Sequence, residues 1–274
     1  MAGGTAALSR DPFVPPFLSR GSLLPLWSVA PSRQPELMDD PSLPDQDHLD
    51  ALNALTRINA LSRTATGLAT AILQLSRGIE WTRPLRIIDV ASGGGDVTVA
   101  LAKKLQRRLP RGVGAEVTGI DISPRAVARA QSMADARGVK GVTFAVHDAL
   151  AEGCPPCDFA VNSLFLHHLS DAQAEKILQG MAAAASVGVV VSDLLRSRVG
   201  LWLAHLGTTL LSSSRVARVD GPLSVRASRT LPEYRQLLDR SGMESAHILR
   251  RWPQRALLVW PVAHRDRIAR EPRR

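Results

Sequence analysis

The chain has 274 residues, a formal net charge of +9 and a hydrophobic content of 45%. This hydrophobic content is ordinary for a folded protein and excludes general disorder. The longest apolar stretch, residues 199–211, is interrupted by His205, Gly207 and two threonines, so no segment is predicted to span a membrane. We therefore expect a protein of the cytoplasm.

Almost all of the basic excess lies after Asp193, in a region with many arginines and no lysine. A basic surface attracts phosphate, which makes nucleic acid a partner to consider. No Gly-Arg or aromatic-basic repeat accompanies these arginines, so a stacking surface for single strands is not indicated. Nucleic acid is therefore the less favoured partner.

The two cysteines, Cys154 and Cys157, flank two prolines. A Cys-Pro-Pro-Cys run outside a strand-then-helix setting does not indicate a redox pair, and no further ligands stand at a metal-binding spacing. The sequence therefore predicts a turn with two thiols and no metal site.

The two ends of the chain differ in composition from its middle. Residues 1–35 contain six prolines and little periodicity, which predicts a flexible leader. Residues 36–80 begin with acidic residues and continue with leucine and isoleucine at helical spacing, so we expect one or two helices that form a cap on the core. Residues 265–274 are predicted to be a basic tail.

Residues 81–264 show the alternation of an α/β domain. Short apolar runs predict strands, and longer amphipathic runs between them predict helices. Because each helix must cross back over the sheet, consecutive strands are expected to pair in parallel. The predicted strands are 85–90, 115–122, 142–146, 159–163 and 188–192, and the predicted helices are 96–109, 124–137 and 172–184.

The C-terminal part predicts a different connection. Residues 228–241 have helical spacing, and residues 244–250 and 256–260 follow as two strands close together in the sequence. Such strands are typical of an antiparallel hairpin, which we place at the edge of the sheet. The predicted fold class is therefore α/β: a Rossmann-like seven-stranded mixed sheet flanked by helices, with an N-terminal helical cap.

A glycine-rich turn follows the first predicted strand, with the sequence Asp89-Val-Ala-Ser-Gly-Gly-Gly-Asp96. Glycines allow a tight turn and the close approach of a ligand at the carboxyl end of the sheet. A dinucleotide site would need a third glycine where Thr98 stands, and Asp96 would repel a pyrophosphate. The turn suits an uncharged sugar and a zwitterionic amino acid better.

This turn resembles the first motif of class I S-adenosylmethionine-dependent methyltransferases. Their usual form has glycine where Ala91 stands, while alanine is the form in the menaquinone/ubiquinone C-methyltransferases, to which this stretch is similar. The resemblance covers about residues 80–195 and implies S-adenosylmethionine as the cofactor. It implies that the following residues lie near the methionine part of the cofactor: Asp89, Ala91, Ser92, Gly93 and Gly95.

Three further stretches match this family in order, each at the end of a predicted strand. Asp121 ends the second strand, where a carboxylate can accept both ribose hydroxyls, and Ile122 is expected against the adenine. The resemblance implies that Asp148 and the Ala149 amide bind the adenine edge, and that backbone near Asn162 meets the cofactor. The alternative for each acid alone is a helix cap or a turn.

His167 and His168 follow the fourth predicted strand, beside the expected methyl group. A general base helps when the nucleophile is a hydroxyl or a carbon acid, and histidine suits neutral pH. Both are therefore candidate catalytic bases, and the alternative is that one of them packs in the core or caps a helix. Asp193 is expected in a solvated turn, with the orientation of a substrate hydroxyl as its alternative role.

Residues 196–227 lie where relatives place lid or substrate helices, and the apolar stretch 199–211 suits the wall of a pocket. The acidic stretch from Glu36 and the segment from Asp220 are similar to bacterial small-molecule methyltransferases of polyketide pathways. The sequence therefore predicts an enzyme that methylates oxygen or carbon of a small, hydrophobic or aromatic acceptor. The alternatives are a nucleic-acid methyltransferase and a catalytically silent S-adenosylmethionine-binding partner protein, and the oligomeric state is left open.

Overall fold

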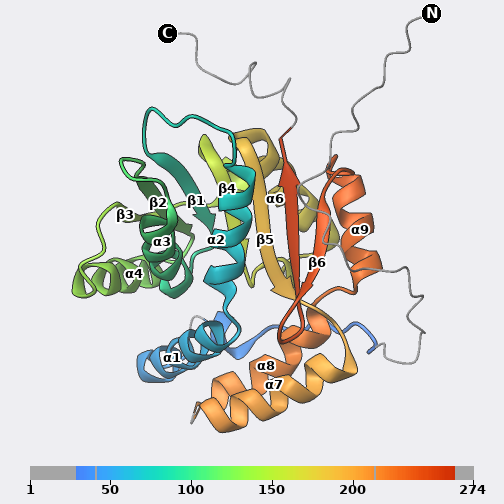
Figure 1. Ribbon diagram of the computed structural model, residues 1–274. Helices are drawn as coiled ribbons and strands as arrows, with labels where there is room; N and C mark the ends of the chain where they lie inside the picture. The colour runs from blue at the N-terminus through green and yellow to red at the C-terminus, as the bar shows by residue number, and fades with distance from the viewer. Residues whose placement is uncertain (1–28, 41, 213, 263–274) are drawn as a thin grey trace, which may run out of the picture.

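The computed structural model of the protein describes residues 29–40, 42–212 and 214–262. Residues 1–28 of the predicted leader and the whole predicted basic tail lie outside this part. Within it, one sheet contains seven strands (Figure 1): β1 (Leu85–Val90), β2 (Ala115–Asp121), β3 (Val142–Val146), β4 (Cys157–Ser163), β5 (Ala185–Leu194), β6 (His247–Arg251) and β7 (Arg255–Pro261).

The strands are ordered β3-β2-β1-β4-β5-β7-β6 across the sheet. Strands β1 to β5 pair in parallel, and β7 runs antiparallel between β5 and β6. The predicted Rossmann-like, seven-stranded mixed sheet is therefore confirmed, with the two C-terminal strands paired at one edge.

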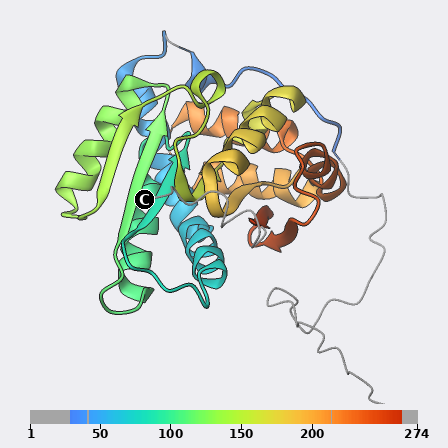
Figure 2. The same cartoon turned by 90° about the horizontal axis from the view of Figure 1, so that it is seen from above.

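Helices connect the strands and cover both faces of the sheet. Helices α2 and α3 pack on one face, while α6 and α9 pack on the other (Figures 1 and 2). The helices are α1 (Asp45–Leu61), α2 (Thr64–Leu75), α3 (Asp96–Arg108), α4 (Pro124–Ala136), α5 (Ala149–Glu152), α6 (Asp171–Ala184), α7 (Arg198–Leu211), α8 (Arg215–Ala227) and α9 (Leu231–Arg240), with the short 3-10 helices η2 (Leu37–Asp39) and η3 (Leu166–His168).

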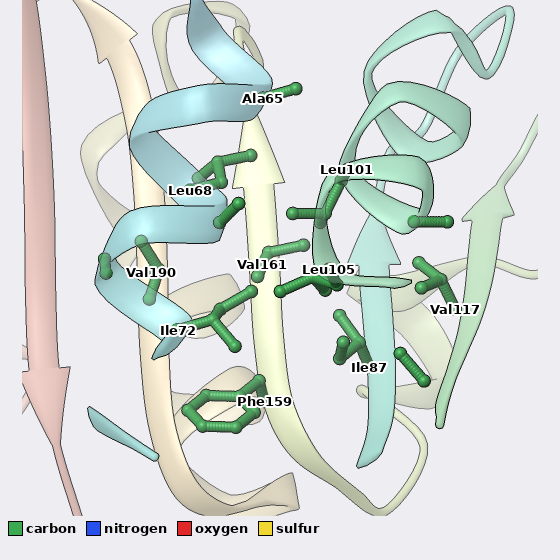
Figure 3. Packing of buried hydrophobic residues seen from close by; sticks show 14 of the residues in the cluster. Ala65, Leu68, Ile72, Ile87, Leu101, Leu105, Val117, Phe159, Val161 and Val190 are labelled. Carbon is green, nitrogen blue, oxygen red and sulfur yellow. The ribbon is translucent and has the colours of Figure 1, made fainter. Parts of the chain in front are cut away.

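The core on the α2 face is built from aliphatic side chains at helical spacing (Figure 3). Leu68 and Ile72 of α2 and Leu101 and Leu105 of α3 are buried over the central strands, with Phe159 of β4 in the same cluster. Because helices cover both faces, β1 and β4 are apolar along most of their length, which is why they stand out in the sequence as short apolar runs.

Helices α1, α7 and α8 pack together beyond the carboxyl ends of the parallel strands (Figure 1). The loops after β1, β2 and β4 emerge at the same end, which is where open α/β sheets bind their ligands. Among the described helices, none combines the length and the hydropathy that crossing a lipid bilayer would require.

Residues 215–227 form helix α8 within the predicted lid region, although their own spacing did not define a helix. Gly221 and Pro222 lie in its middle, and both residue types disfavour helix interiors. Tertiary packing overrides that preference: a Cβ at Gly221 would lie 2.6 Å from Cγ2 of Thr208, so glycine permits a close contact between α7 and α8.

The helix predicted within residues 228–241, with Leu231-Pro-Glu at its start, is α9 and spans Leu231–Arg240. Thr230 and Glu233 form a capping box at this point, in which each side chain binds the backbone amide of the other residue. The capping box fixes the start of α9 at Leu231.

We expect Gly221→Ala to lower the free energy of unfolding by about 1–3 kcal/mol, because its Cβ would collide with Thr208 across the α7–α8 contact. Helix propensity alone would favour alanine by about 1 kcal/mol, so the sign of the change reports on the contact. Thr208→Ser removes Cγ2 and should recover most of the loss in the double variant. Chemical denaturation measures these energies, and a Gly221→Ala protein as stable as the wild type would contradict the close packing.

Candidate active site

The turn between β1 and α3 contains two glycines in the left-handed region, Gly93 with φ +53° and Gly95 with φ +78°. They serve different purposes. A Cβ on Gly95 would lie 2.6 Å from the Cβ of Ala130 and 2.8 Å from the ring of Phe144, so this glycine lets the turn pack on α4 and β3. A Cβ on Gly93 would meet no described atom within 4 Å, so Gly93 borders open space.

Ala91 in the same turn also has a positive φ of 54°, a conformation that favours glycine. Glycine is the usual residue at this position in the class I methyltransferases that the turn resembles. The backbone of this chain therefore keeps the conformation that glycine would adopt, although alanine stands there.

Asp89 ends β1 as a buried carboxyl group, and one of its oxygens accepts a hydrogen bond of 2.6 Å from Oγ1 of Thr98. Burial raises the pKa of Asp89 to about 7, with Asp96 and Asp121 adding to the rise against the Thr98 hydrogen bond. Within the described chain, three buried polar atoms near this strand end have no hydrogen-bond partner: Oδ1 of Asp89, Oγ of Ser92 and Oδ1 of Asn162.

Buried polar atoms in folded proteins are nearly always paired, so these acceptors point to a ligand or water that donates hydrogen bonds. The amino group of a zwitterionic amino acid is such a donor. The residues at the end of β1 therefore fit the methionine part of the predicted cofactor, together with the open space beside Gly93.

Asp121 lies at the end of β2, and its carboxylate joins two loops. One oxygen accepts from the amide of Gly93 at 2.8 Å, and the other accepts from the amide of Ser123 at 2.9 Å. The neighbouring Ile122 is 66% exposed and so offers an apolar surface for a flat base. The arrangement is compatible with the predicted ribose and adenine contacts.

Asp148 follows β3 and accepts hydrogen bonds from the amides of Leu150 and Ala151, so it caps the short helix α5. Asn162 of β4 donates from Nδ2 to the carbonyl of Val90 at 2.6 Å, which ties β4 to β1. The structure thus places the predicted cofactor residues at the carboxyl edge of neighbouring strands. Their contacts with a cofactor stay predictions, as does that of the half-buried Ala149.

His167 in η3 is buried, and its Nδ1 lies 2.6 Å from Oδ1 of Asp193. Because a carboxylate can only accept, Nδ1 of His167 carries the hydrogen of this bond. Burial raises the pKa of Asp193, but the charge and the hydrogen bond of His167 lower it by more, and the pKa lies below its ordinary value.

The interpretation of Asp193 as a solvated turn residue is wrong, because its exposure is 0%. Strand β5 continues to Leu194, two residues beyond its predicted end, and carries Asp193 into the interior beside η3. There its carboxylate also accepts from the amides of His167 and Leu194. It is therefore a positioning residue for His167.

A carboxylate from the N-terminal segment meets both histidines. Oε1 of Glu36 lies 3.8 Å from Nε2 of His167, and Oε2 of Glu36 lies 3.9 Å from Nε2 of His168. Ser224 of α8 donates a 2.6 Å hydrogen bond to Glu36. Asp220, also of α8, accepts from the amides of residues 37 and 38 and so clamps the segment in place.

The sequence did not identify Glu36 and Asp220 as site residues. Their only signal was the similarity of the acidic stretch from Glu36 and of the segment from Asp220 to bacterial small-molecule methyltransferases. Their meeting depends on the N-terminal segment lying against α8, and helical or strand spacing contains no information on such a contact.

The turn that carries the histidines is fixed by a buried arginine. Arg229 donates to the carbonyls of Leu166 and Leu169, which flank the two histidines, and forms an ion pair with Asp171 at 2.8 Å. A buried guanidinium with several acceptors holds such a turn rigidly, because each lost hydrogen bond would leave a buried charge unpaired. His167 and His168 are therefore presented in a fixed orientation.

A cavity of about 340 Å³ lies between α1, α7, α8 and the turn from β6 to β7. Glu36, His167 and His168 line it, and most of its remaining wall is apolar. The predicted lid region 196–227 supplies α7 and α8 to this wall. Among the apolar lining residues are Leu55 and Ile58 of α1, Leu203, Ala204 and Leu206 of α7, and Val225 of α8.

Residues 87–188 match a family model described as a methyltransferase domain. The demethylmenaquinone methyltransferase of Thermus thermophilus is 35% identical over 121 residues, which are 40% of this chain and 51% of that protein. The magnesium protoporphyrin IX methyltransferase from Synechocystis PCC 6803, solved with bound S-adenosylhomocysteine (SAH), is similar in structure with a TM-score of 0.52. That likeness has 18% identity and covers 82% of this chain and 91% of that chain.

Residues 87–188 thus match a methyltransferase domain, and the fold of the chain is that of a class I S-adenosylmethionine-dependent methyltransferase. The resemblance inferred from the glycine-rich turn is thereby confirmed. The plantazolicin methyltransferase in complex with SAH is a further similar structure, with a TM-score of 0.56 and 20% identity over 75% of this chain and 74% of that chain. The chain spans about half the length of the curated relatives it matches, and the structural likenesses show the fold.

The two glycines of the methyltransferase turn offer a matched pair of substitutions. Gly93→Ala and Gly95→Ala both place alanine at a positive φ, which costs about 1–2 kcal/mol. Gly95→Ala adds collisions with Ala130 and Phe144, so it should lower the free energy of unfolding by about 1–3 kcal/mol more than Gly93→Ala. Denaturation of both variants measures the difference, and equal losses would show that Gly95 does not pack as described.

Proposed function

We propose that the protein transfers a methyl group from S-adenosylmethionine to oxygen or carbon of a small, hydrophobic or aromatic acceptor. The observation that carries this proposal is the apolar cavity that ends at His167 and His168, on the same edge of the sheet as the glycine-rich turn. The match of residues 87–188 to a methyltransferase domain and the similar structures solved with bound SAH support the choice of cofactor.

The cofactor would supply an electrophilic methyl group on a sulfonium. The chain supplies the means to hold it: Asp89 and Asn162 offer buried acceptors for the amino group, and Asp121 offers a carboxylate for the ribose. Ile122 offers an exposed apolar surface for the adenine. Asp148 is the proposed acceptor for the amino group of the adenine. Gly93 leaves the space in which the ligand can approach the backbone.

The acceptor would occupy the cavity between α1, α7 and α8. A volume of about 340 Å³ and mostly apolar walls suit a small aromatic or polyketide-like molecule. Methyl transfer is an in-line displacement, so the main requirement is to hold the nucleophile in line with the methyl group. His167, fixed by Asp193, and His168 line this cavity, which supports their proposed role as bases.

The cavity gives less support to a nucleic-acid acceptor. Binding of single strands relies on basic grooves and on aromatic side chains that stack with bases, whereas this cavity is walled largely by aliphatic side chains. The direct test is incubation with methyl-labelled S-adenosylmethionine and a panel of phenols, quinols and polyketides, with transfer RNA as comparison. Labelling of a small molecule supports the proposal, while labelling of RNA alone or of no compound contradicts it.

Asp121→Asn should weaken the binding of SAH roughly 10- to 100-fold, because a charged hydrogen-bond acceptor contributes about 1.5–3 kcal/mol. The amide keeps the size of the side chain and one of the two oxygens that accept from the amides of Gly93 and Ser123, and chemical denaturation of the variant shows whether its fold is preserved. Asp135→Asn, at an exposed position of α4, is the control with unchanged affinity. Titration calorimetry measures the affinities, and equal binding by wild type and Asp121→Asn would rule out the ribose assignment.

Ala204→Trp should fill the cavity and lower methylation of the acceptor by about tenfold or more, because the indole occupies space that the acceptor needs. The affinity for SAH should stay unchanged. His205→Trp places the same side chain at the adjacent exposed position of α7 and should leave both quantities unaltered. Full activity of Ala204→Trp would place the acceptor elsewhere.

A further inference from the structure

We infer that Glu36, His167 and His168 form a binding site for one divalent transition-metal cation of the zinc class, which holds a hydroxyl oxygen of the acceptor. The inference of a cation site depends on these three side chains alone. The role of the acceptor rests on the proposed function. The sequence predicted no metal site, because Glu36 lies far from the two histidines in the chain and the three residues match no metal-binding spacing.

The first argument is the chemistry and spacing of the ligand atoms. Each of the three residues offers one ligand atom, and these atoms all lie within 4.8 Å of one another. The carboxylate oxygens of Glu36 are 3.8 Å from Nε2 of His167 and 3.9 Å from Nε2 of His168. Two imidazoles and one carboxylate are the ligand set of open catalytic sites for zinc and related cations.

The second argument is the shell of partners around these ligands. A metal-binding histidine almost always donates its other ring nitrogen to a carboxylate or carbonyl, which fixes the ring and its tautomer. His167 does so through Nδ1 to Asp193 at 2.6 Å, which leaves Nε2 for a cation. Glu36 is oriented in the same way by Ser224, whose hydroxyl donates to its carboxylate at 2.6 Å.

The third argument is location. All three side chains line the apolar cavity, so a cation among them would face the space that is proposed for the acceptor. A structural metal site is closed by protein ligands on all sides, whereas a catalytic site keeps a position for substrate. This cluster has three protein ligands and an open side, which matches the catalytic arrangement.

The cation would act as a Lewis acid on a phenolic or enolic hydroxyl of the acceptor. The O–H bond breaks and the proton passes to water. The oxygen then forms a bond to the methyl carbon, and the carbon–sulfur bond breaks with its electron pair going to sulfur, which gives SAH. In this form of the site the two histidines are ligands, so the ligand role and the base role are alternatives that an experiment can separate.

The test is titration of the full-length chain, free of any histidine tag and treated with chelator, with Zn²⁺ by calorimetry and with Co²⁺ by visible absorption. We expect one ion per chain and a Co²⁺ spectrum typical of bound imidazole. Glu36→Gln and His168→Ala should each weaken Zn²⁺ binding by a factor of roughly ten or more. His205→Ala, which removes an exposed histidine of α7 outside the cavity, should bind as the wild type does.

Titration of each variant with SAH shows whether the variant is folded. The same titration of the wild type distinguishes a failure of the cation site from a failure of the proposed methyl transfer. Wild type that binds SAH but no Zn²⁺ would overturn the cation site and leave the histidines as bases. Zn²⁺ binding that persists unchanged in both Glu36→Gln and His168→Ala would also overturn it. Wild type that binds Zn²⁺ but not SAH would uphold the cation site while the proposed methyl transfer fails.

Discussion

The site depends on one constraint: parallel strands end at the same edge of the sheet. Asp89, Asp121, Asn162 and Asp193 come from four different strands, and each lies at or near the carboxyl end of its strand. The parallel pairing of β1, β2, β4 and β5 brings these groups together without any direct sequence link between them. The glycine-rich turn can follow β1 closely because Gly95 lets it pack on α4 and β3.

The part of the site around His167 is held in place by charged groups that are buried and paired. An unpaired buried carboxylate is costly, so Asp193 at 0% exposure requires the hydrogen bonds that it receives from His167 and from two amides. Arg229 holds the same turn from the other side through backbone carbonyls. The N-terminal segment then adds Glu36, clamped by Asp220 of α8. These hydrogen bonds hold the polar end of an otherwise apolar cavity rigid.

The sequence was most informative where local physics decides. Apolar runs identified the strands, and their order placed Asp121 at a strand end. It was least informative where distant segments meet. The burial of Asp193 depends on how far β5 extends, and the position of Glu36 depends on a contact with α8. The bounds of helix α8 inside the predicted lid region could not be read from the sequence, because Gly221 and Pro222 disfavour a helix that tertiary packing stabilises.

In the proposed function, the strand edge that binds the adenosyl group and the apolar cavity meet at the turn that carries His167. A crystal structure of the full chain with SAH tests this connection most directly. We predict that the ribose lies at Asp121, that the adenine lies on Ile122, and that the sulfur faces the cavity beside His167. SAH bound within the apolar cavity itself, or its sulfur turned away from His167, would contradict the account.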